Sequence, residues 1–255
     1  MIKEFAFSLS NRHYFQDARE IRSWTGLDSD TFMSLYDYDD SIKEYYGNQK
    51  KLSGYKGLIY MPDEFILDVD GKNLVDASNK TKGLINLLDE LDIPYKIFFS
   101  GTGFHVNIPS DAFRWQPAND LHLRVKHALS DAGIFEFADP SVTDKIRLIR
   151  VPNTKNTKSN LYKVQINISR LNDLDALLLY AKFPRDLDDK ELECNPVFDV
   201  LSESNGKEAN QSPEFVSKGR NPDPVNYPCI SGMLQSNPIG RRHTVALRLA
   251  AWLRW

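Results

Sequence analysis

A short apolar segment that ends in two aspartates constrains this chain more than any other feature. The apolar residues 65–67 predict a buried strand over 64–70, and Asp68 and Asp70 follow them in the sequence DVD. Residues two apart on a strand point to the same side, so both carboxylates leave one face, about 6.6 Å apart along the backbone. Because aspartate is depleted in strands, a solvated sheet face explains such a pair poorly. The spacing allows both carboxylates to bind one divalent cation or to share two.

Strand-like and helix-like segments alternate between residues 64 and 170. Helices are expected near 78–92 and 117–132, where leucine, valine and alanine recur at helical spacing. Further strands are expected in YKIFFS (95–100), FHVNIP (104–109), IFEFA (134–138), IRLIRV (146–151) and YKVQINI (162–168). This pattern predicts an α+β fold in which mixed or antiparallel sheets are flanked by helices.

Polar side chains gather on one face of three predicted strands. In FHVNI the apolar residues alternate with His105 and Asn107, and in YKVQINI they alternate with Lys163 and Gln165. Asp68 occupies the corresponding face of the first strand. A sheet with one apolar face under helices and one face of Asp, His, Lys and Asn side chains is typical of a functional surface.

The two ends of the chain differ in composition from this central part. Residues 1–60 mix aromatic and charged residues without a clean period, so short helices and loops are expected there. Residues 186–224 are rich in Ser, Asn, Gly, Pro and Glu, which predicts a linker or mobile loop. A helix is expected from about Arg241, so 225–255 is interpreted as the start of a C-terminal helical region.

Charge and cysteine content exclude several classes of protein. The 32 basic and 35 acidic residues give a net charge of −3, so any basic footprint for nucleic acid must be local. No apolar run approaches the roughly 20 residues of a membrane helix, and no signal-peptide pattern is present, so a cytoplasmic protein without a membrane partner is expected. With only Cys194 and Cys229, neither a four-cysteine zinc site nor an iron–sulfur cluster is expected.

Three motifs in a fixed order identify a resemblance. They are DVD, then SGTGFH from Ser100, then DPSVTDKIRLIRVPNTKNTKSNLYKV from Asp139. Together they resemble the archaeo-eukaryotic primase superfamily, the primase-polymerases, and in particular its phage- and plasmid-type members. The match covers about residues 60–170 and implies a primase-polymerase catalytic domain over 1–185. The implied activity is metal-dependent nucleotidyl transfer that makes primers on single-stranded DNA, with primer extension as a DNA polymerase.

The resemblance also implies roles for individual residues. Asp68, Asp70 and Asp139 become the catalytic ligands of two Mg²⁺ or Mn²⁺ ions. The residues implied in nucleotide binding are Ser100, Gly101, Thr102, Gly103, His105, Lys158 and Lys163, and those implied in nucleic-acid binding are Arg150 and Lys155. A Gly-Thr-Gly turn fits this role because its backbone N–H groups can approach an anion closely. The implied partners are single-stranded DNA, nucleoside triphosphates and a helicase in cis or in trans.

Several alternatives remain at this point. Asp144 competes with Asp139 as the third acid, although the family's third acid stands before a Val-Thr pair, which favours Asp139. Arg147 and Arg150 lie three apart on a predicted strand, so at most one of them is expected to reach the site. The sequence ILDVDG also resembles the first motif of haloacid-dehalogenase-type phosphatases, in which Asp68 would be a nucleophile. A non-catalytic single-strand-binding or replication-initiator module is the third possibility.

Overall fold

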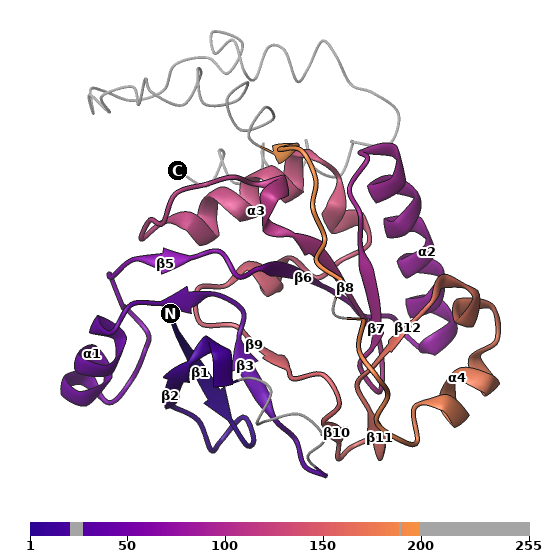
Figure 1. Ribbon diagram of the computed structural model, residues 1–255, viewed down its shortest axis with the longest axis horizontal. Coiled ribbons are helices and arrows are strands. Elements are labelled where there is room, and N and C mark those ends of the chain that lie inside the picture. The colour runs from indigo at the N-terminus through magenta and orange to yellow at the C-terminus, as the bar shows by residue number, and fades with distance from the viewer. Residues whose placement is uncertain (21–27, 189, 199–255) are drawn as a thin grey trace, which may run out of the picture. The chain divides into compact units, whose positions relative to one another are not determined.

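The structure is a computed structural model that describes residues 1–20, 28–188 and 190–198 (Figure 1). All of these residues belong to one compact unit of the chain. The predicted C-terminal helical region, 225–255, and most of the predicted linker lie outside the described residues. No helix in the described part of the chain is long and apolar enough to span a membrane.

The fold is α+β, with antiparallel sheets flanked by helices, which confirms the predicted class. One sheet contains β1 (Ile2–Ala6), β2 (Tyr14–Asp17), β3 (Phe32–Ser34), β4 (Asp37–Tyr38), β5 (Ile59–Tyr60) and β9 (Leu148–Arg150), in the order β5-β4-β1-β3-β9 with β2 also on β1. The second sheet has the order β12-β7-β8-β6 and contains β6 (Glu64–Val69), β7 (Lys96–Phe99), β8 (Phe104–Pro109) and β12 (Val164–Ile166). A small hairpin pairs β10 (Lys155–Asn156) with β11 (Leu161–Tyr162), and the α-helices are α1 (Ser41–Gln49), α2 (Leu74–Glu90), α3 (Leu121–Asp131) and α4 (Leu174–Tyr180).

The four-stranded sheet separates apolar from polar residues as the sequence predicts. Antiparallel pairing sets Asp68 of β6 opposite His105 of β8, so both side chains project from the same face. Helix α2 contacts β6 and β8 and buries Leu84 and Leu88 completely (Figure 1). The side chain of Asn73 caps the first turn of this helix, which fixes where α2 begins beside the sheet.

The segment 1–60 differs from the prediction of short helices and loops, because its described residues, 1–20 and 28–60, form five strands and one α-helix. All five residues of β1 are buried, including the charged Lys3 and Glu4. Lys3 Nζ lies 2.6 Å from Asp37 Oδ1, and Glu4 accepts two hydrogen bonds from Arg12. A strand that buries paired charges shows no alternation in its sequence, which explains why periodicity failed here.

Two predicted strands are also corrected. IFEFA forms a 3₁₀-helix, Ile134–Glu136, after Gly133, whose φ of 77° reverses the chain. The strand predicted over 162–168 is split into β11 and β12, and Ile168 begins a further 3₁₀-helix.

The predicted strand IRLIRV exists as β9, but it pairs with the N-terminal sheet. Ile149 lies opposite Met33, and Arg150 lies opposite Phe32. The chain therefore returns from the site-bearing sheet to the first sheet, where β9 is the strand at one edge.

The first part of the predicted linker packs onto the core. Phe198 is fully buried, its ring centroid is 4.6 Å from that of Phe113, and the backbone N–H of Val197 donates to the carbonyl oxygen of Ala112 at 2.9 Å. The domain core therefore extends past the predicted boundary at residue 185.

Candidate active site

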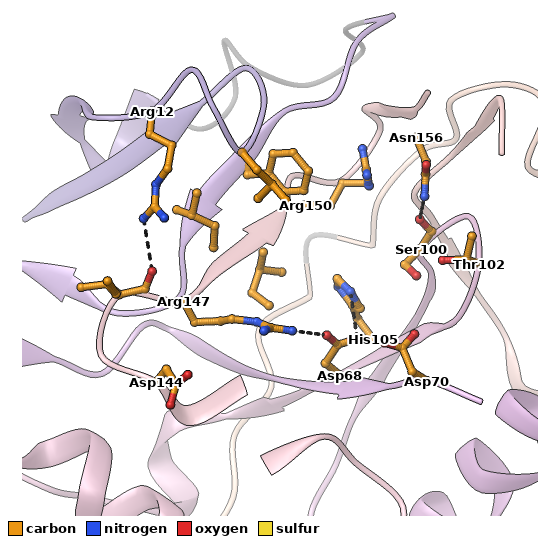
Figure 2. Close-up of a pocket in the computed structure, with 15 residues that line it drawn as sticks. Arg12, Asp68, Asp70, Ser100, Thr102, His105, Asp144, Arg147, Arg150 and Asn156 are labelled. Carbon is orange, nitrogen blue, oxygen red and sulfur yellow. Dashed lines mark hydrogen bonds and ion pairs between the residues drawn. The ribbon is translucent and has the colours of Figure 1, made fainter. Parts of the chain in front are cut away.

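A pocket of about 420 Å³ lies between the two sheets, and six of the twelve predicted site residues line it (Figure 2). Strand β6 and the residue after it contribute Asp68 and Asp70, and the β7–β8 hairpin contributes Ser100, Thr102 and His105. The opposite wall comes from the N-terminal sheet and the segment that leads into β9. Its residues are Leu9, Arg12, Phe32, Asp144, Ile146, Arg147, Leu148, Ile149 and Arg150, with Asn156 at one side.

The third predicted acid lies beside the first, although 70 residues separate them in the chain. The backbone N–H of Asp139 donates to the carbonyl oxygen of Asp68 at 2.8 Å. The Asp139 side chain accepts hydrogen bonds from the backbone N–H and hydroxyl of Ser141, at 2.9 and 2.6 Å. The main chain thus fixes the two acids as neighbours, while Ser141 fixes the direction of the Asp139 carboxylate.

Arg147 balances the charge of this acid cluster. Its Nη2 lies 2.8 Å from Asp68 Oδ2 and 3.6 Å from Asp139 Oδ2, and its Nη1 donates to Ser141 Oγ at 3.1 Å. Burial, followed by the nearby carboxylate of Asp70, raises the pKa of Asp68 to about 6, even though Arg147 acts in the opposite direction. The ionised form of Asp68 is therefore disfavoured mainly by burial, and Arg147 offsets only part of that cost.

His105 faces the same carboxylate from the neighbouring strand. Its Nε2 lies 3.5 Å from Asp68 Oδ1, and burial lowers the pKa of the imidazole well below its usual value, which keeps the ring neutral. Its Nδ1 is buried and has no hydrogen-bond partner among the described residues. A buried polar atom without a partner is uncommon in folded proteins, so this nitrogen is a distinctive feature of the site.

The SGTG turn is held close to the acids by its glycines. Gly101 has a φ of 102°, and a Cβ at Gly103 would lie 2.7 Å from Asp70 Oδ1. The backbone N–H of Ser100 donates to the carbonyl oxygen of Gly103 at 2.9 Å, and Asn156 Nδ2 donates to the carbonyl oxygen of Ser100 at 3.3 Å. Only glycine permits this approach, so the turn and the DVD pair form one surface.

Both arginines of the IRLIRV segment line the pocket, which corrects the expectation that at most one would reach it. The strand begins only at Leu148, so the alternation of a pleated strand does not apply between Arg147 and the residues after it. Arg150 projects from β9 itself, where its guanidinium carbon lies 4.8 Å from the centroid of the Phe32 ring.

The predicted lysines do not converge on the pocket. Lys163 is fully buried, and its Nζ donates to the carbonyl oxygen of Arg150 at 2.8 Å. Burial lowers the pKa of Lys163 to about 7, so this side chain serves the interior rather than the pocket surface. Lys158 is exposed on the loop after β10, and Lys155 Nζ lies 3.9 Å from Asp28 Oδ1.

Sequence reasoning missed the residues that the N-terminal sheet contributes. Arg12, bound to the buried Glu4, also donates to the carbonyl oxygen of Ile146 at 3.3 Å and lines the pocket (Figure 2). Leu9 and Phe32 lie on the same wall. No motif surrounds these residues in the sequence. The pairing of β3 with β9 brings Phe32 to the site, and Leu9 and Arg12 come from the segment between β1 and β2.

The acid cluster suits a divalent cation in its chemistry, although it is not assembled as a metal site. Across residues 1–20, 28–188 and 190–198, no three His, Cys, Asp or Glu side chains stand close enough together to hold a metal ion as they lie. Arg147 instead provides the positive charge between Asp68 and Asp139. Carboxylate oxygens are the ligands that Mg²⁺ and Mn²⁺ prefer, which is why the donor set suits such a cation.

No protein-family model and no curated protein matches the chain. Among solved structures, the chain is similar to the polymerase domain of Mycobacterium tuberculosis ligase D in complex with DNA, with a TM-score of 0.39 and 10% sequence identity. The alignment covers 70% of this chain and 60% of that one, so it spans less than two thirds of the neighbour. A likeness of this size carries no argument about activity, and the interpretation of the site rests on its own residues.

Proposed function

We propose that the chain is a metal-dependent nucleotidyltransferase that joins nucleoside triphosphates on a single-stranded DNA template, as a primase and as a primer-extending polymerase. The observation that carries this proposal is the backbone hydrogen bond between Asp139 and Asp68, which places a third acid beside the DVD pair. The pocket that Asp68 and Asp70 line is also lined by Ser100, Thr102 and His105. Acids for metal ions and donors for phosphates are the two requirements of phosphoryl transfer.

Asp68, Asp70 and Asp139 would hold two Mg²⁺ or Mn²⁺ ions. When bound, such ions lower the pKa of the attacking 3′-hydroxyl and neutralise charge on the leaving pyrophosphate. The SGTG turn would bind the triphosphate through its backbone N–H groups, and the neutral His105 would contact a phosphate oxygen. Arg12 and Arg150 on the opposite wall would position the nucleotide or the strand by charge.

The phosphatase alternative fits the geometry less well. A nucleophilic aspartate needs a free carboxylate oxygen, whereas Arg147 and His105 contact the two oxygens of Asp68 from different sides. A module that binds nucleic acid without catalysis would place phosphate groups beside the carboxylates of Asp68, Asp70 and Asp139. Without a metal ion, the repulsion between these negative charges is unfavourable.

Incorporation of a labelled nucleotide on single-stranded DNA tests the proposal, with Mg²⁺ or Mn²⁺ and with or without a primer. Asp68→Asn is expected to lower incorporation about a hundredfold or more, because it removes one metal ligand charge. Asp144→Asn is the matched control. Asp144 lines the same pocket, but among the described residues its carboxylate forms no ion pair with Arg147. Undiminished incorporation by Asp68→Asn, or phosphate release from a small phosphomonoester in its place, would overturn the proposal.

A further inference from the structure

The carboxylate of Asp30, two residues before β3, is surrounded by hydrogen-bond donors. Nη1 of Arg150 donates to Oδ1, and the hydroxyl of Thr157 donates to Oδ2. The backbone N–H of Thr157 donates to Oδ1 at 3.3 Å. Burial alone would raise the pKa of Asp30, but the hydrogen bonds from Thr157 and Arg150 outweigh burial and lower it. Three donors from two separate segments therefore converge on one anion.

Arg150 is held in place by contacts that do not involve Asp30. The guanidinium of Arg150 stacks on the Phe32 ring and donates to the carbonyl oxygen of Lys155 at 2.9 Å. The neighbouring backbone N–H of Val151 donates to the carbonyl oxygen of Thr31 at 2.9 Å, which fixes the main chain beside Asp30. The guanidinium of Arg150 would thus keep its position if only the Asp30 side chain turned away, and the hydroxyl and backbone N–H of Thr157 would be free to donate to another anion.

A second carboxylate, that of Asp28, lies close to Lys155 in β10. Asp28 Oδ1 is 3.9 Å from Lys155 Nζ and accepts a hydrogen bond from the hydroxyl of Tyr162. Arg150 and Lys155, the two side chains that the sequence assigns to nucleic acid, are therefore both paired with carboxylates from the segment before β3. Arg150 also lines the active-site pocket, so the Asp30 position adjoins that pocket.

A guanidinium, a hydroxyl and a backbone N–H around one anion are the donors that proteins use to bind phosphate. We propose that these donors form a phosphate-binding site, and that Asp30 fills it until a phosphate group displaces its side chain. The inference rests on the proposed function, which supplies two sources of that group, a nucleic-acid strand and a nucleoside triphosphate. The Asp30 carboxylate acts as an internal substitute for phosphate, and Asp28 neutralises Lys155 beside it.

Removing the internal carboxylate is expected to increase affinity for phosphate. Asp30→Asn keeps the shape of the side chain but withdraws its charge, so a labelled single-stranded oligonucleotide should bind about fivefold tighter or more without divalent metal. The plot of log affinity against log salt should steepen by about one unit, because one further phosphate contact forms. The control is Asp17→Asn, which makes the same change of charge at a half-buried aspartate, the last residue of β2, whose partner is the exposed Arg19.

Two further variants keep the test decisive. Asp28→Asn changes an exposed side chain, so folding is not at risk, and it should tighten strand binding about twofold by releasing Lys155. Thr157→Val in the Asp30→Asn background should reverse most of the gain, because it removes the hydroxyl donor. Melting temperatures of all variants separate binding effects from loss of structure.

The same titration with a nucleoside triphosphate distinguishes the two sources of phosphate. A gain for the oligonucleotide assigns the site to the strand, and a gain for the triphosphate assigns it to the nucleotide. If Asp30→Asn and Asp28→Asn match Asp17→Asn with both ligands while the wild type incorporates nucleotides, only this inference is overturned. If the wild type neither binds nor incorporates, the proposed function fails and the inference fails with it.

Discussion

The guanidinium of Arg147 bridges two acids that come from distant parts of the chain, with Nη2 2.8 Å from Asp68 Oδ2 and 3.6 Å from Asp139 Oδ2. Arg147→Gln should lower the free energy of unfolding by about 1–3 kcal/mol without divalent metal, because the buried Asp68 loses its partner. Excess Mn²⁺ should restore part of this loss, since a bound cation replaces the missing charge. Thermal melting with and without Mn²⁺ measures both effects.

Arg124→Gln is the control for Arg147→Gln. Arg124 forms a half-exposed pair with Asp120 on α3, so its loss should change the free energy of unfolding by under about 0.5 kcal/mol, with or without Mn²⁺. Equal responses of the two variants to Mn²⁺ would contradict the assignment of the acid cluster.

Lys163 should make stability depend on pH. Its pKa is about 7 in the folded protein, below the ordinary value of 10.5, so the unfolded chain binds more protons between these two values. The free energy of unfolding should therefore rise as the pH increases from about 7 to 10.5, by an amount on the order of 5 kcal/mol from this group. Urea unfolding across this range measures the slope.

Lys163→Met should flatten that slope, whatever its effect on stability at one pH. The exposed Lys158→Met should leave it unchanged. A wild-type slope that survives in Lys163→Met would show that the buried ammonium is not its source.

Gly103→Ala should disturb Asp70 more than it disturbs the fold. The new Cβ would lie 2.7 Å from both Asp70 Oδ1 and the carbonyl oxygen of Val69, so the turn must move away from the DVD pair. Metal-dependent nucleotide binding, measured by calorimetry, is expected to weaken about tenfold or more, because the acid and the turn no longer form one surface. Gly47→Ala in α1 meets no atom within 4 Å and should retain binding with equal or higher stability. Identical binding by the two variants would refute the close contact of turn and acid.

Phe198→Ala in the full chain tests whether the core extends past residue 185. Because Phe198 is fully buried against Phe113, its truncation should cost about 3–5 kcal/mol in the free energy of unfolding. Phe183→Ala removes a ring that is 65% exposed and should cost under about 0.5 kcal/mol. Similar losses in denaturant unfolding would place Phe198 outside the cooperative core.

The sequence predicts best where one residue pattern decides the structure. The strand that bears Asp68, the β7–β8 hairpin with its Gly-Thr-Gly turn and helix α2 all follow from local periodicity and turn residues. Their polar faces also follow, because alternation on a strand is a local property.

The parts that were not predicted depend on contacts between distant segments. β1 can bury the charged Glu4 because Arg12, eight residues further along the chain, pairs with it. The sequence of β1 alone does not show this pairing. Arg147 reaches the acids because β9 begins one residue later and pairs with β3. The hydrogen bond from Thr157 to Asp30 joins residues 127 positions apart in the sequence, and no motif contains Asp30.

The pairing of β9 with β3 limits how the domain can be divided. A fragment cut to the motif-bearing stretch, about 60–170, would retain β9 but lose the strand that covers its edge. An uncovered strand edge recruits strands from other molecules, so such a fragment should aggregate on expression. Co-expression with a separate peptide that contains β1 to β3 should rescue its solubility, since the missing partner would be supplied from outside. The smallest fragment that can be produced alone must therefore include the strands that pair with β9. The motifs by themselves do not define its ends.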